Sequence, residues 1–580
     1  MKKSLLFFLI VLTGLIYSQP KEEVRAVWVT TVFNLDWPRT SGANTQRTEM
    51  IQLLDKLKAA NFNTIMLQVR GRGDLLYGSA IEPWARALTG SLGGNPGYDP
   101  VQFTIEEAHK RGMEVHAWWN VYKVYGTGTP PVTNPQHVVH RHPNLVKLYD
   151  GEWWMDPGEP GTKTYLLNLA MEMVRKYPLD GIHFDFIRYP GTDFSDSASY
   201  ANYGGGVNKS DWRRSNINNF VTAIYDSIQL VRPKMKVGSA PIGIYKDLST
   251  CNSGWDAYTQ VFQDSRRWLL ARKHDYLSPQ VYWDISTCPR FDSLALDWIT
   301  GRGGRHIYMG IAAYRMTAAD GNWPAAEILA QVDTSRKFGA QGQTYFRTAS
   351  FIDNQKNLYN LIKANQYLYP ANIPPMPWKD NVKPLSPENL TVTAQDSLTY
   401  ILKWQKSPAA SDGDTAKYYN VYMDTVFPVD TSDIKKVIAF GRRDTTFTVV
   451  FANKPSQNYY FTVTAYDKGY NESAPSITAG IIVTGIADEN NTPGDFSLYQ
   501  NYPNPFNPET VIGFSLPEAG EVKLTVYSAL GKEVAVLYSG MAEKGNHRVN
   551  FLAENLSSGA YYASLSYNGS VKSIKMLFLK

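Results

Sequence analysis

Cysteine is scarce in this sequence, with only Cys251 and Cys288 among 580 residues. No serine or cysteine lies in a nucleophile-elbow context, which argues against a Ser- or Cys-triad hydrolase. No glycine-rich phosphate loop follows the first strand-like run, which argues against a dinucleotide-binding sheet. The net charge of +5 is spread thinly and contains no basic run. A nucleic-acid partner held through its phosphates is therefore not expected.

Long apolar runs are also missing once the N-terminus is passed. Lys2 and Lys3 precede an apolar run over residues 5–16, with a plausible cleavage zone near Ser18. This pattern is typical of a secretory signal peptide, expected over residues 1–19. We expect an exported mature chain without a transmembrane segment. In an oxidising compartment Cys251 and Cys288 can form a disulfide, and two free thiols remain the alternative.

What the sequence does contain is a regular alternation of strand-like and helix-like stretches. Helical patterns such as 48–60, 101–111, 164–176, 215–231 and 325–338 separate the strand-like runs. Eight such units predict a (β/α)₈ barrel over residues 22–369, with a doubly wound sheet as the competing α/β fold. The eight predicted strands are 25–32, 64–69, 114–119, 181–187, 236–241, 276–282, 307–313 and 343–348.

The remainder of the chain predicts two small all-β sandwich domains. A Pro-rich stretch over 370–387 indicates a linker. Residues 388–486 alternate apolar and polar residues and resemble a fibronectin type III module with Trp404 as its core tryptophan. The motifs YPNPFNP, VKLTVYSALGKEV and SGAYY within 494–580 closely resemble the C-terminal sorting domain of type IX secretion substrates. That resemblance implies the type IX machinery as a partner and a location at the cell surface or outside the cell.

The stretch DGIHFDFIRYP carries the first catalytic candidate, Asp185. Side chains alternate along a strand, so Asp185 shares a face with His183 and Ile187. A carboxylate on an otherwise apolar strand costs several kcal/mol of desolvation unless a partner compensates it. At the C-terminal end of a barrel strand it would face the mouth where such enzymes keep their chemistry. A structural role, with Asp185 held by Arg188, is the alternative.

Aromatic, amide and charged residues gather where the other predicted strands end. Together they indicate an oligosaccharide or glycan-strand cleft more than a metal or phosphate site, and no metal or cofactor is expected. Trp118 and Trp119 could instead fill the barrel, and Arg70 could hold loops through an ion pair. The catalytic candidates beside Asp185 are Tyr282, Asp74 and Asp284. The substrate-binding candidates are Arg70, Glu82, Trp84, Trp118, Trp119, Asn120, His183, Gln280, Trp283 and Tyr314.

Motifs at nearly every strand end carry a family resemblance. RAVWVTTVFNLDWP, LQVRGRGDLLYGSAIEPWARALTG, HAWWNVYKV, DYLSPQVYW and YMGIAAYR are similar to glycosyl hydrolase-like family 10, the DUF187 group. The resemblance spans about residues 25–368. It implies a barrel glycosidase of exported bacterial proteins, with cleavage of peptide-free peptidoglycan strands as the activity. Where this family commonly has two adjacent acids, the present chain has Asp185 followed by Phe186.

Three schemes follow, since glycoside hydrolysis normally needs two carboxylates. In the first, Asp185 is the acid and the substrate's own acetamido group attacks, oriented by Tyr282. In the second, Asp185 works with Asp74, Glu82 or Asp284. In the third, the cleft binds glycan without cutting it. The prediction is a secreted glycoside hydrolase acting on cell-wall or related N-acetylhexosamine glycans; the alternatives are a non-catalytic surface carbohydrate-binding protein and a structural adhesin.

Overall fold

A computed structural model describes residues 19–126, 132–250, 253–481, 496–553 and 556–579. The signal-peptide prediction over 1–19 falls almost wholly outside these residues, as does Cys251. No helix in the described part of the chain combines the length and apolar character needed to cross a bilayer. Contacts divide the chain into two compact units, residues 1–454 with 459–481 and residues 455–458 with 482–580. Each unit is described by itself.

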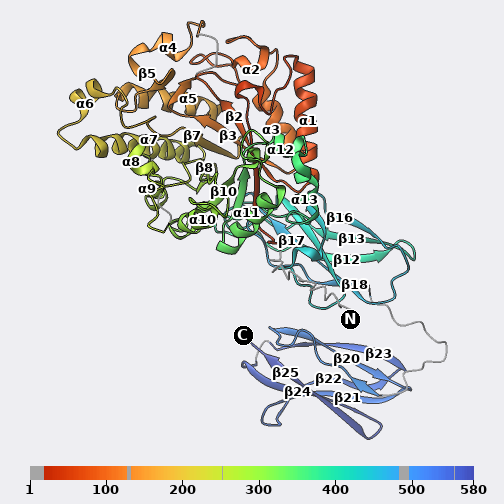
Figure 1. Cartoon of the computed structure of the whole chain (residues 1–580). Coiled ribbons are helices and arrows are strands. Elements are labelled where there is room, and N and C mark those ends of the chain that lie inside the picture. Colours follow the sequence, from red (N-terminus) through yellow and green to blue (C-terminus); the bar gives the residue numbers. More distant parts are fainter. Residues whose placement is uncertain (1–18, 127–131, 251–252, 482–495, 554–555, 580) are drawn as a thin grey trace, which may run out of the picture. The chain divides into compact units, whose positions relative to one another are not determined.

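The first unit is built on a closed eight-stranded parallel barrel, which confirms the predicted fold class (Figure 1). Strand order around the barrel follows chain order, and β1 pairs with both β2 and β11 to close it. The strands are β1 (Val24–Val29), β2 (Thr64–Arg70), β3 (Glu114–Asn120), β7 (Gly181–Asp185), β8 (Lys236–Ser239), β9 (Tyr276–Leu277), β10 (His306–Ile311) and β11 (Gly342–Tyr345).

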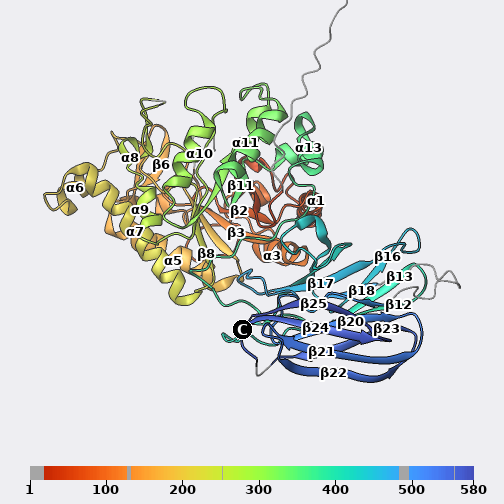
Figure 2. The same cartoon turned by 90° about the horizontal axis from the view of Figure 1, so that it is seen from below.

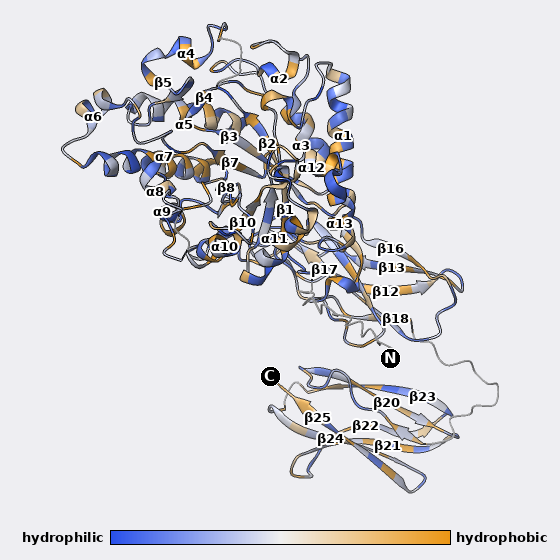
Figure 3. Ribbon diagram, viewed as in Figure 1, coloured by the Kyte–Doolittle hydropathy of each residue, from blue (hydrophilic) through white to orange (hydrophobic). Residues whose placement is uncertain are grey.

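Amphipathic helices surround these strands, as the view from below shows (Figure 2). Helix α3 (Pro100–Lys110) illustrates why they form: the Asp99 side chain accepts from the amides of Val101 and Gln102, and Pro100 occupies the first turn. Hydrophobic and hydrophilic colours alternate along α1 (Ala43–Ala59) in Figure 3. The other long helices are α5 (Pro160–Lys176), α7 (Lys209–Val231), α10 (Phe291–Thr300) and α11 (Ala325–Phe338). Shorter ones are α2 (Arg86–Thr89), α4 (Val138–Arg141), α6 (Ser197–Tyr203), α8 (Ala257–Gln260), α9 (Ser265–Leu270), α12 (Ala349–Ile352) and α13 (Leu358–Ala364).

Polar side chains inside the barrel are joined in a hydrogen-bonded chain. The Trp28 indole can only donate, so His183 Nε2 accepts from it at 2.9 Å and the His183 proton resides on Nδ1. His183 Nδ1 lies 3.1 Å from the Tyr276 hydroxyl, which also lies 2.7 Å from His116 Nδ1. Burial lowers the pKa of His183 well below its ordinary value, so the imidazole is neutral. The barrel below its mouth is therefore packed with side chains, several of them joined by hydrogen bonds.

Between β3 and α5 the chain inserts a small antiparallel sheet in the order β4 (Lys123–Tyr125), β6 (Glu152–Met155), β5 (Val146–Tyr149). Met155 N donates to Tyr122 O at 2.7 Å, which fastens this sheet directly behind the end of β3. The insertion therefore extends the barrel wall at the mouth.

A middle β domain follows the Pro-rich linker within the same unit. Its two antiparallel sheets have the orders β12-β13-β16 and β15-β14-β17-β18. Trp404 is buried and packs against the Tyr419 ring at 5.7 Å, as expected of a core tryptophan. The fibronectin type III resemblance stays a prediction. The strands are β12 (Glu388–Ala394), β13 (Thr399–Gln405), β14 (Tyr418–Asp424), β15 (Val437–Arg442), β16 (Thr446–Val450), β17 (Tyr459–Tyr466) and β18 (Ala479–Ile481).

The second unit is an antiparallel β domain with its own hydrophobic core. One sheet has the order β19-β20-β23 and the other β22-β21-β24-β25. Phe514, Leu524 and Leu565 are fully buried between the strands. The strands are β19 (Ser497–Leu498), β20 (Glu509–Leu516), β21 (Gly520–Ser528), β22 (Glu533–Ala542), β23 (Gly545–Leu552), β24 (Gly559–Tyr567) and β25 (Ser570–Phe578).

Candidate active site

Asp185 is the last residue of β7 and lies at the C-terminal end of the barrel. Its Oδ1 accepts from Phe186 N at 2.7 Å and from Gln280 Nε2 at 3.2 Å. Phe186 has a positive φ of 50°, a backbone conformation that turns the chain away directly after the carboxylate. Burial raises the pKa of Asp185 to about 6, and the Phe186 amide and the Arg188 guanidinium limit the rise. Asp185 is therefore a carboxyl group that keeps its proton up to about pH 6.

Several predicted site residues lie around Asp185. Strand register places Asn120 beside it on β3. Asn120 Nδ2 donates to Gly71 O at 2.8 Å, whereas its buried Oδ1 has no hydrogen-bond partner among the described residues. The Trp118 indole lies in the barrel interior, and its N–H interacts with Asp185 and favours the charged form of that carboxylate. The buried Oδ1 of Asn120 is therefore available to a ligand or a water molecule.

Aromatic rings form the opposite wall. The Tyr282 ring stacks on Phe346 at 6.0 Å and meets Tyr314 edge-on at 5.9 Å. Burial raises the pKa of Tyr282 well above its ordinary value, and the nearby charge of Asp185 adds to this rise. Tyr282 therefore keeps its hydroxyl proton and serves as a hydrogen-bond donor. Stacked rings beside a carboxyl group suit a pyranose ring and its substituents.

Two charged candidates pair with each other instead of lining the mouth. Arg70 donates from Nε and Nη2 to Glu82 at 2.8 and 2.6 Å, and both side chains are fully buried. Arg70 also donates to the carbonyl of Val121 at 3.0 Å, and Tyr165 donates to Glu82 at 3.0 Å. We assign this pair to holding the loops behind β2 and β3.

Three further predicted residues have no contact with Asp185 in the structure. Trp119 lies on the outer face of β3, where the Arg70 guanidinium covers its ring at 4.8 Å. His183 lies one layer deeper in the barrel and is fully buried. Trp84 is half-buried against Gly78. In this structure none of the three presents a free face to the mouth.

The remaining candidate acids, Asp74 and Asp284, accept hydrogen bonds from nearby backbone amides. Asp74 is buried and accepts from the amides of Arg72 and Arg86 at 3.0 and 3.2 Å. It lines a separate pocket of about 290 Å³ together with Phe33 and Tyr125. Asp284 accepts from the amides of Ser286 and Thr287, and these hydrogen bonds outweigh burial and lower its pKa.

Trp283 is half-buried, and its carbonyl accepts from Gln331 at 3.2 Å. Cys288 is disulfide-bonded, and the sequence offers Cys251 as its one partner cysteine, outside the described residues.

Comparison of the sequence with models of protein families identifies the family of this chain. The model of the glycosyl hydrolase-like 10 family matches residues 23–325. The chain belongs to this family.

Two curated relatives of this glycosyl hydrolase-like 10 protein align with it over most of their own length. Glycosyl hydrolase YngK of Bacillus subtilis is 31% identical over 482 residues, covering 79% of this chain and 93% of the relative. Glycosyl hydrolase DigH of Escherichia coli K12 is 35% identical over 330 residues, covering 52% of this chain and 75% of the relative. The protein is accordingly a glycoside hydrolase.

One solved structure is the PgaB (BpsB) glycoside hydrolase domain of Bordetella bronchiseptica. It aligns over 59% of this chain and 98% of that one, at 14% identity and a TM-score of 0.41.

A second family match places the secretion system C-terminal sorting domain at residues 500–580. These residues lie within the second unit. The protein is therefore exported to the cell surface or the extracellular space, as the sequence motifs predicted.

The glycosyl hydrolase-like 10 barrel also carries mouth residues that the sequence did not reveal as a group. The Arg188 guanidinium lies over the rings of Trp154 and Phe186 at 5.3 and 5.2 Å. Lys123 lies over the same two rings and pairs with Glu152 at 2.6 Å. Arg188 forms no ion pair with a described carboxylate within 4 Å. The sequence does contain aromatic and basic residues after β3 and β7. Whether these residues contact one another depends on the path of the inserted sheet, which the sequence did not reveal.

Proposed function

We propose that this glycoside hydrolase cleaves within N-acetylhexosamine glycans of the bacterial cell wall, with peptide-free peptidoglycan strands as the favoured substrate. The observation that carries the proposal is Asp185, a carboxyl group with a pKa of about 6 at the mouth of the barrel. Departure of a sugar alkoxide needs a proton donor, and a carboxyl group is an efficient donor when its pKa lies near the working pH.

The engagement of the other acids favours the substrate-assisted scheme. Glu82 is buried against Arg70, and Asp74 and Asp284 accept hydrogen bonds from backbone amides of their own loops, which favours structural roles for these three acids. In this scheme Asp185 donates its proton to the glycosidic oxygen as the C–O bond breaks. The acetamido oxygen of the same sugar forms the new bond to the anomeric carbon. Water, deprotonated by the Asp185 carboxylate, then opens this ring and restores the acid.

Tyr282 and Asn120 are placed to position the acetamido group. Tyr282 retains its hydroxyl proton and can donate a hydrogen bond to the acetamido oxygen. The free Oδ1 of Asn120 can accept from the acetamido N–H or from a sugar hydroxyl. A hydrogen bond that strengthens as charge develops on the acetamido group stabilises the transition state more than the bound substrate.

Arg188 supports the choice of peptide-free strands. Removing the stem peptide leaves a free carboxylate on each muramic acid residue, and Arg188 at the mouth lacks a carboxylate partner of its own in the described chain. Burial lowers the pKa of Arg188, and the charges of Asp185 and Glu152 favour its protonated form. A planar guanidinium can bind a carboxylate through two hydrogen bonds.

Digestion of peptide-stripped glycan strands with mass analysis of the products tests this proposal. We expect shorter strands with new reducing ends from the wild type. Arg188→Met should raise KM for muramic acid-containing strands about tenfold, the loss expected for one charge-assisted contact, and leave KM for neutral chitooligosaccharides unchanged. Arg175→Met, which removes an exposed arginine on α5, is the matched control.

Retention of strands in a pull-down without any fragment release by the wild type over a day would contradict the proposal. That result would favour a carbohydrate-binding protein.

A further inference from the structure

The second feature of interest lies at the opposite end of the barrel from Asp185, where the strands begin. A pocket of about 440 Å³ opens there between the barrel and the middle β domain. Its walls come from the ends of α1 and α3, the starts of β3 and β7, the linker and the middle β domain. The lining residues with charged side chains are Lys58, His109, Lys110, Arg111, Glu114, Asp180, Lys417 and Arg443.

Both carboxylates of this pocket already have partners. Glu114 accepts from Lys236 Nζ at 2.8 and 2.9 Å, and its pKa is lowered because that cation and His116 outweigh the effect of burial. Asp180 lies 2.7 Å from His109 Nε2 and accepts from Val115 N at 2.9 Å. Neither acid is free to neutralise a further cation.

Two of the lining cations are paired elsewhere. Arg111 bonds Asp55 at 2.6 Å, and Lys110 bonds Glu107 at 2.6 Å. The other three, Lys58, Lys417 and Arg443, have no carboxylate within 4 Å among the described residues. None of these three cations is therefore neutralised by a direct ion pair in the described chain.

The contacts of these three cations show how exposed their charge is to a ligand. Lys417 Nζ donates to the Tyr470 hydroxyl at 2.9 Å, and Arg443 donates to the carbonyl of His109 at 2.8 Å. Lys58 Nζ has no hydrogen-bond partner in the described chain. Burial lowers the pKa of Lys58 and of Lys417; for Lys417 the charges of Glu114 and Asp180 offset part of this effect, whereas Lys236 and Arg443 add to it. A bound anion would remove this penalty.

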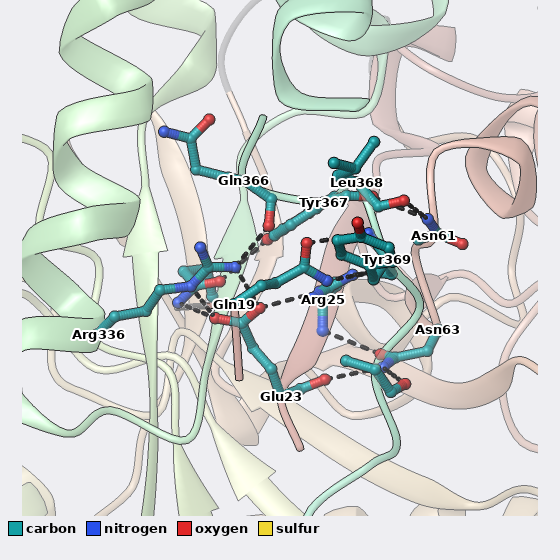
Figure 4. Close-up of polar contacts among 12 residues, drawn as sticks. Gln19, Glu23, Arg25, Asn61, Asn63, Arg336, Gln366, Tyr367, Leu368 and Tyr369 are labelled. Carbon is teal, nitrogen blue, oxygen red and sulfur yellow. Dashed lines mark hydrogen bonds and ion pairs between the residues drawn. The ribbon is translucent and has the colours of Figure 1, made fainter. Parts of the chain in front are cut away.

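A neighbouring cluster shows how the same fold treats buried cations elsewhere (Figure 4). There Glu23 accepts from Arg25 at 2.9 Å and from Arg336 at 2.7 and 2.8 Å, so one carboxylate serves both guanidinium groups. Asn61 and Asn63 belong to this network and also line the pocket. The pocket thus differs from this cluster in holding three cations, Lys58, Lys417 and Arg443, that have no directly paired carboxylate among the described residues.

We propose that this pocket binds an anionic group, phosphate or carboxylate, carried on a sugar-sized molecule. Lys58, Lys417 and Arg443 would hold the anion, and the apolar wall of Phe62, Met113 and Ile373 would cover the body of the ligand. The volume lies in the range of small-molecule sites in proteins. Because the walls come from both the barrel and the middle β domain, the ligand would fasten the two together. This site is separate from Asp185 and does not depend on the proposed glycan chemistry.

Isothermal titration of the full mature chain with three probes tests the proposal, at constant ionic strength set with KCl. The probes are inorganic phosphate, N-acetylglucosamine 1-phosphate and N-acetylmuramic acid. We expect saturable binding of at least one probe at millimolar concentration or below. Preference for the sugar phosphate over the sugar acid, or the reverse, identifies which anion the site takes.

Lys58→Met and Lys417→Met should each weaken that binding at least tenfold, whereas Lys163→Met on the exposed face of α5 should leave it unchanged. Lys58→Met removes an unpaired, half-buried charge, so the melting temperature of this variant without ligand should not fall. An unchanged melting temperature distinguishes lost binding from misfolding. Absence of saturable binding for all three probes, or equal affinity in wild type and both pocket variants, would overturn the proposal.

Discussion

At the scale of single residues, Asp185 has a pKa above its ordinary value of 3.8 because the barrel mouth buries it. The Phe186 amide, the Arg188 charge and the side chains of Trp118 and Gln280 offset only part of that effect. Nearby Asp284 shows the opposite behaviour. Four hydrogen bonds from Ser286 and Thr287 favour its charged form and lower its pKa. Two acids in the same region are thereby separated in pKa, which is how enzymes distinguish a proton donor from a permanent anion.

The pH dependence of the reaction follows from the raised pKa of Asp185. Below about pH 6 the group is protonated and can donate, and above it the free enzyme loses its acid, so kcat/KM should fall as pH rises through about 6. Arg188→Met should shift this fall to higher pH, because the Arg188 guanidinium lowers the pKa of Asp185. Initial rates on soluble glycan strands between about pH 4.5 and 8 measure both effects. A profile that is flat across this range, or unmoved in the variant, would contradict the assignment.

The sequence predicted the orientation of the candidate side chains only in part. The two-residue period of a strand allows only one of Trp118 and Trp119 to face the barrel interior, and the structure selects Trp118. The same period predicts that His183 and Asp185 share a face of the strand. It does not predict how deep in the barrel His183 lies, where it contacts Trp28 and Tyr276. Depth depends on neighbouring strands that are distant in sequence.

At the scale of elements, all eight barrel strands were predictable because apolar and β-branched runs alternate with amphipathic helices. The extent of β9 was not. The sequence predicts a strand over 276–282, whereas regular pairing ends at Leu277. Pro279 has no amide proton to donate to a ladder, and Gln280 rejoins the sheet only through isolated bridges to Ile242 and Gly310. That irregular backbone is what brings Gln280 to Asp185.

The buried ion pair of Arg70 and Glu82 connects the end of β2 to the loop that follows it. The sequence could not show that these two residues pair, because the pairing depends on the path of that loop. Removing one partner leaves an uncompensated buried charge. We therefore expect Arg70→Met or Glu82→Gln to lower the free energy of unfolding by about 3–5 kcal/mol. Arg39→Met breaks an exposed pair with Asp353 and should cost less than about 1 kcal/mol. Urea unfolding measures both. Loss of activity in Glu82→Gln at unchanged stability would instead indicate a role in substrate binding.

At the scale of the whole molecule, the chain combines a catalytic unit with a separately folded sorting domain. The hydrophobic cores of the two units are formed by separate sets of residues. A chain ending at residue 481 should therefore still release fragments from glycan strands in cell extracts. It should fail to reach the cell surface or medium, because the sorting domain is absent. Fractionation with immunoblotting reports location. Truncated protein found outside the cell in wild-type amounts would contradict this account.

The most direct test of the account is the release of reducing ends from peptide-free glycan strands by Asp185→Asn, measured together with its thermal unfolding. The asparagine retains an oxygen for the Phe186 amide and carries no buried charge. It should therefore unfold at no lower temperature than the wild type, and near pH 7 at a higher one, since ionising a buried carboxyl whose pKa is raised to about 6 costs the wild type about 3 kcal/mol. The account predicts a folded protein whose fragment release falls at least a thousandfold. Full activity in the folded variant would show that another group supplies the proton.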